Sequence, residues 1–316
     1  MIVSIKKILK TSTPLIFGAV LVWYSLSKIS INVLIGYFKE ANYEWIFLGL
    51  FFGILSHLSR AYRWKFMLDP LGFKPRFTNS VLAVLVGYLV NLAIPRAGEV
   101  SRAFVLTNYE QIPFEKGFGT IVAERIADLV MMLCIIIITL FVQFDFIYDL
   151  LTKNLDASKI SIGLIILTII CYVLYFFVKK ATSGILLKIK TFVIGLVEGV
   201  TSIFRMKNKV AFIFHTIFIW VMYVAMFWAT IPAISGLEVP FGGVLIGFIA
   251  GGFSIAATNG GIGLYPIAVA GALALFDIPS DPATAFGWIM WTAQTAMIII
   301  FGGLAFLFLP IYNKHK

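Results

Sequence analysis

Long apolar runs follow one another along almost the whole chain, separated by short segments that hold most of the charged residues. A straight helix needs about 20 apolar residues to cross the hydrocarbon core of a bilayer. Runs of that length predict membrane-spanning helices, and shorter ones predict segments that enter the bilayer without crossing it. The runs lie near residues 13–31, 45–66, 80–95, 117–141, 160–178, 210–235, 241–258, 262–276 and 285–309.

Three of the runs, 80–95, 241–258 and 262–276, are too short to cross, and glycine and proline collect in and beside them. We interpret them as parts of two broken, re-entrant hairpins. With the N-terminus inside, this arrangement places 20 of the 25 Lys and Arg residues on the cytoplasmic side and four on the other, as the positive-inside rule requires. The pattern therefore predicts an all-α, polytopic transmembrane bundle with about six full spans, two broken hairpins and both termini in the cytoplasm.

The two halves of the chain repeat one order of segments. Residues 45–141 and 210–309 each run as a span, a broken piece and a span, but the broken pieces enter from opposite sides. That order is typical of an inverted-topology repeat, in which paired discontinuous segments mark a site near the membrane midplane. We predict a single integral membrane domain over residues 1–316. Between the repeats, residues 182–209 are amphipathic and predict a helix on the cytoplasmic surface, or one that only covers loops.

Composition and charge agree with this class. The chain is 60% hydrophobic and 13% charged, with a mean hydropathy of +0.98, which excludes a soluble domain. We attribute its net charge of +10 to membrane topology and expect no nucleic acid partner. No cleavable signal peptide is expected, and Cys134 and Cys171 lie in apolar runs that suggest neither a metal nor a disulfide. Because a nucleotide-binding loop is also absent, we expect no cofactor.

The most unusual stretch is "IPRAGEVSRA" at 94–103, where an apolar run ends in Pro95 and charges follow. Proline stops the preceding helix, and Glu99 and Arg102 fall at i and i+3 of a new helix whose N-terminal amides can hold an anion. We interpret Pro95, Arg96, Glu99 and Arg102 as the tip of a broken hairpin, which is allowed at membrane depth only where it lines protein or a water-filled cavity.

Two further charge clusters lie in or near spans. Arg60 and Arg63 share one helix face near the end of the second span; they are substrate-binding candidates, or arginines that extend to the interface beside a Trp64 anchor. Glu124, Arg125 and Asp128 fall about one turn into an apolar span, with Arg125 placed to pair with Asp128. Ionisable groups in a span predict a functional site, and the alternative is a buried network that fixes helix packing.

The second break, "ATNGGIGLYP" at 257–266, is a glycine turn in which Asn259 is the strongest polar group. The amides around Asn259, Gly260 and Gly261 form a candidate cradle for a phosphate oxygen, although a simple tight turn explains the sequence equally well. His57 and His215 lie in apolar runs, and we interpret them as buried, hydrogen-bonded histidines and not as metal ligands.

At these residues the chain resembles the lysylphosphatidylglycerol synthase transmembrane region family, also called flippase-like membrane proteins. The resemblance rests on Arg60 and Arg63 before a Gly-Phe loop, "NLAIPRAGEVSRA" at 91–103, "ERIAD" at 124–128 and the glycine turn at 259–263. It implies a membrane domain that translocates a lipid, as relatives do for aminoacylated phosphatidylglycerol across the bacterial inner membrane.

Two departures from the family pattern limit what the resemblance implies. Larger relatives carry a soluble aminoacyl transferase domain after the membrane part, whereas this sequence stops at Lys316, so we expect that it does not make the aminoacylated lipid by itself. Many relatives also read Pro-Gly-Gly-x-Gly-x-x-Glu at the second break, where this chain has Asn259 and Pro266, and Trp291 stands where an arginine often occurs.

The sequence thus predicts a non-enzymatic, flippase-like transporter of a phospholipid or other phosphate-headed lipid in the bacterial cytoplasmic membrane. Its expected partner is a membrane lipid with an anionic or zwitterionic head group; a separate lipid-modifying enzyme and a second copy of the chain are further candidate partners. One alternative is a membrane glycosyltransferase, or an accessory protein, that acts on a polyprenyl-phosphate-linked lipid. A non-catalytic scaffold is another.

Overall fold

The computed structural model describes residues 18–94, 96–154 and 206–314, with a few separate positions between 166 and 194. The described residues form helices joined by turns, and no strand occurs among them. The predicted all-α fold is therefore confirmed. The chain divides into two compact units, of which one holds Met1–Glu124 with Val210–Lys316 and the other Arg125–Lys209.

Four helices of the described chain are long and apolar enough to cross a membrane, and they match four of the predicted runs. They are α3 (Tyr43–Leu68) with the 3-10 turn η1 (Asp69–Leu71), α6 (Phe114–Val142), α10 (Lys209–Thr230) with the 3-10 turn η2 (Ile231–Ala233), and α13 (Ser280–Tyr312). The chain is thus a multi-pass membrane protein. In the second unit, α6 is followed by α7 (Phe144–Asn154). The span expected at 160–178 and most of the surface helix expected at 182–209 lie outside the described residues.

The first predicted span, at 13–31, is not one straight helix in its described part. Helix Gly18–Leu26 is followed by α2 (Ile31–Glu40), which runs at 84° to it, and together the pair can form a fifth, broken crossing. The bend falls at the polar residues Ser27 and Lys28, where the Ser27 hydroxyl donates to the Tyr24 carbonyl at 2.7 Å. This local hydrogen bond competes with continuation of the helix.

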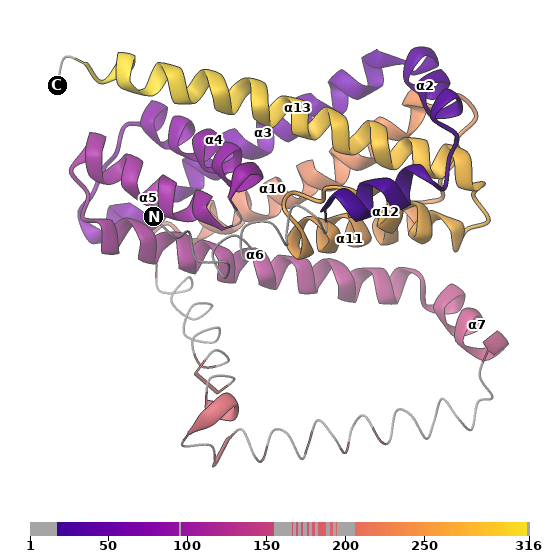
Figure 1. The fold of residues 1–316 in the computed structure, drawn as a ribbon. Helices are drawn as coiled ribbons and strands as arrows, with labels where there is room; N and C mark the ends of the chain where they lie inside the picture. Colours follow the sequence, from indigo (N-terminus) through magenta and orange to yellow (C-terminus); the bar gives the residue numbers. More distant parts are fainter. Residues whose placement is uncertain are drawn as a thin grey trace, which may run out of the picture. The chain divides into compact units, whose positions relative to one another are not determined.

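Two pairs of short helices form hairpins, as the short apolar runs predict. The first is α4 (Phe77–Ala93) with α5 (Ala97–Glu110), and the second is α11 (Phe241–Ala257) with α12 (Leu264–Ala274). In Figure 1 the two helices of each pair lie against each other. At 17 residues or fewer, none of the four reaches the length of a straight crossing.

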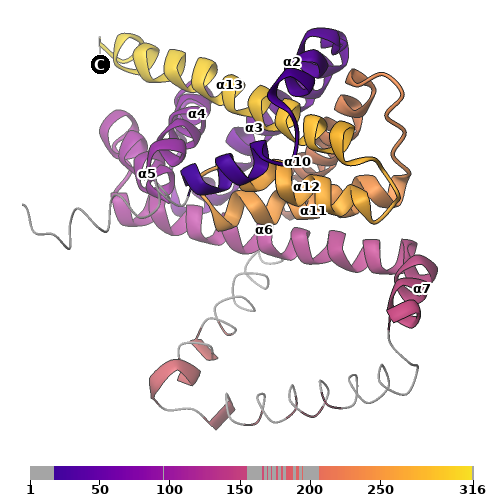
Figure 2. The same ribbon diagram turned by 45° about the vertical axis from the view of Figure 1, so that its right-hand side comes forward.

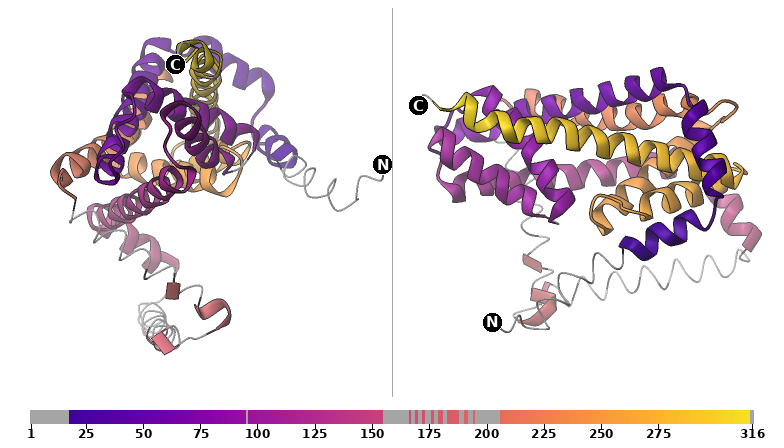
Figure 3. Two further views of the ribbon diagram at one scale, coloured as in Figure 1. Left: turned by 90° about the vertical axis from the view of Figure 1, so that its left-hand side faces the viewer. Right: turned by 45° about the horizontal axis from the view of Figure 1, so that its top comes forward.

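Helix α13 runs past both hairpins, which open at opposite ends of the first unit (Figures 2 and 3). Near its C-terminal end, the Asn313 side chain donates to that of Asn79, at the start of α4, at 3.0 Å. Near its N-terminal end, Gly287 packs on Pro266 of α12, where a Cβ on the glycine would lie 2.6 Å from the proline Cα. Opposed hairpins between long helices are the arrangement expected of an inverted repeat.

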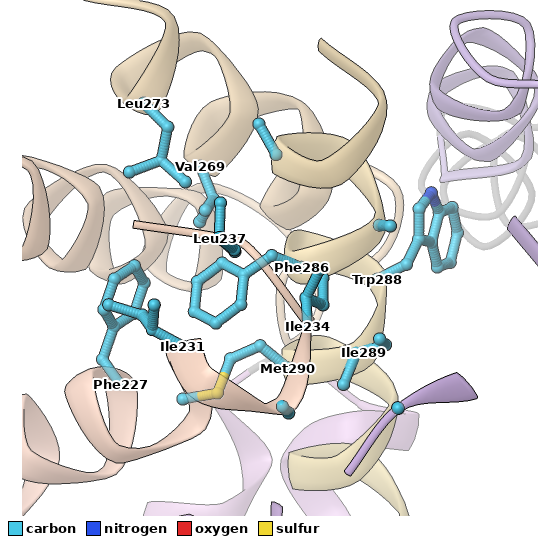
Figure 4. Close-up of a cluster of buried hydrophobic side chains, with 14 of the residues drawn as sticks. Phe227, Ile231, Ile234, Leu237, Val269, Leu273, Phe286, Trp288, Ile289 and Met290 are labelled. Carbon is cyan, nitrogen blue, oxygen red and sulfur yellow. The ribbon is translucent and has the colours of Figure 1, made fainter. Parts of the chain in front are cut away.

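Each hairpin packs in an apolar core of its own. Figure 4 shows the core around α12, where Phe227 and Phe286 meet edge to face with ring centroids 5.0 Å apart. The core around α4 and α5 includes Trp64, Ala103 and Leu106. The two hairpins are therefore held separately, and α13 contributes to both cores.

Candidate functional site

Glu124 of α6 lies at the centre of three arginine side chains. Arg60 of α3 forms an ion pair with it, and the guanidinium of Arg102, from α5, donates to both of its carboxylate oxygens at 3.2 and 3.0 Å. Arg63, one turn from Arg60, lies 3.4 Å from the same carboxylate. All four side chains are at most 3% exposed. We call these four residues the Glu124 cluster.

The Glu124 cluster lies well inside two of the long helices. Glu124 is ten residues from the start of α6, and Arg60 is eight residues from the end of α3. At 1.5 Å per residue, these positions are about 15 and 12 Å inside their helices. Because α6 begins at Phe114, before the apolar run, Glu124 lies nearly three turns from the start of the helix, whereas the sequence predicts about one turn into the span. Charges at the centre of a membrane span cost about 2.5 to 3.5 kcal/mol each on insertion scales, and charges within spans normally pair with one another.

Aromatic and hydroxyl side chains fix the arginines of the cluster. The Arg102 guanidinium lies over the ring of Trp64, 4.3 Å from its centroid, and the Trp64 indole donates to Thr120 at 2.8 Å. Arg63 donates to Thr216 of α10 at 3.0 Å. The alternative in which Arg60 and Arg63 extend to the interface is therefore wrong, and Trp64 is a buried platform instead of an interface anchor.

A line of polar side chains continues from the cluster toward the middle of α3. Arg60 donates to the hydroxyl of Tyr223 at 3.4 Å, and that hydroxyl lies 3.2 Å from the hydroxyl of Tyr88. The Tyr88 ring in turn lies against His57, with centroids 4.4 Å apart. These residues come from α3, α4 and α10, so the line joins one arm of the first hairpin to two long helices.

The tip of the first hairpin positions Arg102. Asn91 accepts a hydrogen bond from the amide of Gly98 at 2.7 Å, and its own amide lies 3.4 Å from the Glu99 carboxylate. The absence of a side chain on Gly98 allows α4 and α5 to touch, since a Cβ there would lie 2.1 Å from the Gly87 carbonyl oxygen. Arg96 adopts a left-handed backbone conformation at the tip, and its side chain is exposed, outside the Glu124 cluster.

The second tip has a different construction. Gly260, Gly261 and Gly263 all take positive φ, which glycine adopts without strain. The Trp291 indole donates to the Gly260 carbonyl at 2.8 Å, and a Cβ on Gly260 would lie 2.8 Å from the side chain of Leu92. The two tips thus touch each other. The turn at Asn259–Gly261 is therefore held by Trp291 and lies against Leu92.

The remaining predicted charges belong to the second unit. Arg125 and Asp128 form the expected pair at i and i+3, 3.6 Å apart, with Arg125 partly exposed. His215 is hydrogen-bonded as predicted, since its Nδ1 lies 2.8 Å from the hydroxyl of Ser59. Within the described ranges, no group of three or more His, Cys, Asp and Glu side chains is arranged to hold a metal ion.

Sequence reasoning missed several polar residues of the site. Thr216 and Tyr223 are seven positions apart on α10, so they fall on one face, but each is isolated in an apolar run. Tyr88 and Asn91 are similarly placed on α4. The two pairs have in common that they lie in segments that pack against α3 or the first tip. This packing is known only from the structure, so the sequence alone could not identify these residues.

Two curated proteins show partial similarity to the chain. One is the UPF0104 membrane protein MJ1595 of Methanocaldococcus jannaschii, which is 32% identical over 125 residues, or 39% of this chain and 37% of that protein. The other is the glycosyltransferase AglD of Haloferax volcanii, 31% identical over 77 residues, or 24% of this chain and 12% of AglD. The matched segments thus span well under half of either relative.

No solved structure gives a significant match to the chain. The family model described as the lysylphosphatidylglycerol synthase TM region matches residues 12–302, which include all four residues of the Glu124 cluster and both hairpins. The chain therefore belongs to the lysylphosphatidylglycerol synthase TM region family.

Proposed function

We propose that the protein is a flippase-like transporter that moves a phospholipid or another phosphate-headed lipid across the membrane. The observation that carries the proposal is the convergence of three guanidinium groups on Glu124 inside the spanning helices, with one of the three, Arg102, supplied by a broken hairpin. Ionisable groups within spans are by default functional. Their position next to a discontinuous segment is typical of transport sites.

The chemistry of the cluster suits a phosphate head group. A guanidinium presents a planar fork of donors that matches the oxygens of a carboxylate and of a phosphate equally well. In the structure the Glu124 carboxylate occupies the fork of Arg102. In our proposal, a lipid phosphate competes with Glu124 for this fork, and the carboxylates of Glu124 and Glu99 balance the arginines or accept a cationic part of the head group.

The two hairpin tips have complementary roles in this proposal. Arg96 is exposed at the first tip and provides an outer contact for the phosphate before it reaches the buried arginines. The amides around Asn259, Gly260 and Gly261 provide a second, neutral contact for phosphate oxygens. Because Leu92 and Gly260 touch, movement of either hairpin changes the separation of the two contacts.

The test is translocation of fluorescent phosphatidylglycerol in proteoliposomes, read out as the fraction of label accessible to a membrane-impermeant quencher. We expect Arg102→Gln to reduce the rate at least tenfold and Arg102→Lys to restore it only in part, since lysine keeps the charge but not the fork. Lys116→Gln, an exposed charge in the first turn of α6, is the matched control and should behave as wild type. Wild-type rates in a correctly folded Arg102→Gln protein would refute the assignment.

The similarity to the glycosyltransferase AglD favours a second candidate, a membrane glycosyltransferase or its accessory protein acting on a polyprenyl-phosphate-linked lipid. Both candidates require recognition of a lipid phosphate, so the Glu124 cluster is compatible with either. The discriminating measurement is incubation of the purified protein with a polyprenyl phosphate and radiolabelled nucleotide sugars. Transfer of label to the lipid would support this candidate, and no transfer together with head-group translocation would support the flippase.

A further inference from the structure

A buried histidine near the middle of α3 has a ring nitrogen that forms no hydrogen bond within the described part of the chain. His57 is 8% exposed, and its Nε2 has no hydrogen-bond partner among the described residues. A buried polar atom without a partner costs about 1 to 3 kcal/mol, and in a folded protein it calls for an explanation. A histidine in water changes its charge near neutral pH, whereas burial at this position disfavours the charged form.

The neighbouring serine indicates what Nε2 can bind. The Ser56 hydroxyl donates to the Gly53 carbonyl at 2.6 Å, so towards His57 it can only accept. His57 Nδ1 lies 3.5 Å from that hydroxyl, which favours the tautomer with its proton on Nδ1. Nε2 then carries a lone pair, and the species it can take up is a proton.

The groups around the imidazole come from three helices. Tyr88 of α4 covers it at 4.4 Å between centroids, Tyr223 of α10 meets it edge-on at 6.4 Å, and Arg60 lies one turn further along α3. Aromatic faces stabilise a cation placed against them, whereas a positive Arg60 nearby opposes a second positive charge. The hydroxyls of Tyr88 and Tyr223 connect the histidine region to Arg60 and thus to the Glu124 cluster.

We infer that His57 is a proton-binding site whose occupancy is linked to the anionic lipid phosphate at Arg60. A phosphate bound to the arginines adds negative charge one helical turn from the imidazole, so lipid and proton favour each other's binding, and by linkage the effect is reciprocal. The proton passes from a hydronium ion to Nε2, leaving water, and returns from Nε2 to a water molecule. This inference rests on the proposed function and supplies a driving force for it, the transmembrane proton gradient.

The test measures protons taken up when the full-length protein in detergent binds a short-chain phosphatidylglycerol. Titration calorimetry in two buffers with different ionisation enthalpies, at about pH 6.5, gives the number of protons linked to binding. We expect wild type to take up a measurable fraction of a proton per lipid, and His57→Gln and His57→Asn to bind lipid with no uptake. His215→Gln is the matched control, since it removes a hydrogen-bonded histidine of α10, and it should behave as wild type.

The outcomes separate this inference from the proposed function. Lipid binding by wild type without proton uptake, or equal uptake by the His57 variants, would overturn the proton site and leave the lipid site standing. Failure of the wild-type protein to bind any phosphate-headed lipid would overturn the proposed function and this inference together. In proteoliposomes, a gradient of one pH unit should change wild-type translocation several-fold and leave the rate of His57→Gln unchanged.

Discussion

The two broken hairpins share an architecture but differ in chemistry. The α4–α5 hairpin carries Arg96, Glu99 and Arg102, and Arg102 reaches the buried carboxylate of Glu124. The segment 241–274, which holds α11 and α12, has no charged residue at all. Its tip is organised by positive-φ glycines and by a single indole hydrogen bond from Trp291.

The comparison indicates that the same backbone arrangement is used for two purposes. In the first hairpin, a side chain of the re-entrant segment takes part in a charge cluster, so movement of the hairpin has to break or exchange ion pairs. In the second, α11 and α12 carry no charged residue, so this hairpin can move without breaking an ion pair of its own. The first hairpin is therefore the better candidate for the element that responds to a charged ligand, and the second for a more passive counterpart.

The largest loss of stability should follow from removing the Glu124 carboxylate, which Arg102 of the first hairpin contacts. Glu124→Gln leaves Arg60, Arg63 and Arg102 converging on a neutral amide, and we expect a loss of about 3 to 5 kcal/mol of stability, the usual cost of deleting one partner of a buried ion pair. The thermal unfolding midpoint in detergent should fall markedly. Glu115→Gln, an exposed carboxylate in the first turn of the same helix, should leave the midpoint unchanged. Equal midpoints for the two variants would show that the cluster does not hold the hairpin.

A smaller loss of stability should follow from replacing the glycines that let the two helices of each hairpin pack closely. In Gly98→Ala, the new Cβ would lie 2.1 Å from the Gly87 carbonyl oxygen, a backbone atom, so α4 and α5 must separate. In Gly251→Ala, the nearest atom is in the Tyr265 ring at 2.7 Å, which can rotate away. We expect a loss of about 3 kcal/mol or more for the first and about 1 to 2 kcal/mol for the second.

Gly271→Ala is the matched control for both glycine variants, because nothing lies within 4 Å of its Cβ position and alanine is the better helix former. Chemical or thermal unfolding of the three proteins in one detergent provides the ranking. A Gly251→Ala protein less stable than Gly98→Ala would mean that the second hairpin is the more tightly closed of the two.

The elements of this fold could be predicted well because membrane solvation acts on local sequence. Length and hydropathy placed α4, α11 and α12 within three residues of their observed ends, since a short apolar run bounded by glycine or proline has few alternatives in a bilayer. The bend after Leu26 was not predicted, because Ser27 and Lys28 are common enough at the interface to appear ordinary.

The site could be predicted only as a set of unusual residues. Arg60, Arg63, Arg102 and Glu124 were identified because charge within a span is costly wherever it points. Their mutual contacts depend on how four helices pack, and a single sequence contains no direct signal for that. Arg96 shows the limit: it lies next to the same motif as Arg102, yet a left-handed turn directs the chain so that its side chain is exposed.

The smallest expected effects compare the polar contact that closes each tip. Asn91→Ala removes the acceptor of the Gly98 amide, and Trp291→Phe removes the donor to the Gly260 carbonyl. Each deletion should cost about 1 kcal/mol, the usual net value of one hydrogen bond. Stability alone will therefore not distinguish the two variants.

Hydrogen exchange and translocation measured together should separate these two variants. Asn91→Ala should speed exchange of the amides at the start of α5 several-fold and also slow lipid movement, because α5 supplies Arg102 to Glu124. Trp291→Phe should speed exchange only around residues 260–263 and leave lipid movement near the wild-type rate, because the contact that it removes is a hydrogen bond to a backbone carbonyl. If Trp291→Phe instead slowed lipid movement as much as Asn91→Ala, the contact between Leu92 and Gly260 would have to transmit the change from one hairpin to the other. The second hairpin would then be an active partner in transport, and the asymmetry of charge would not be an asymmetry of function.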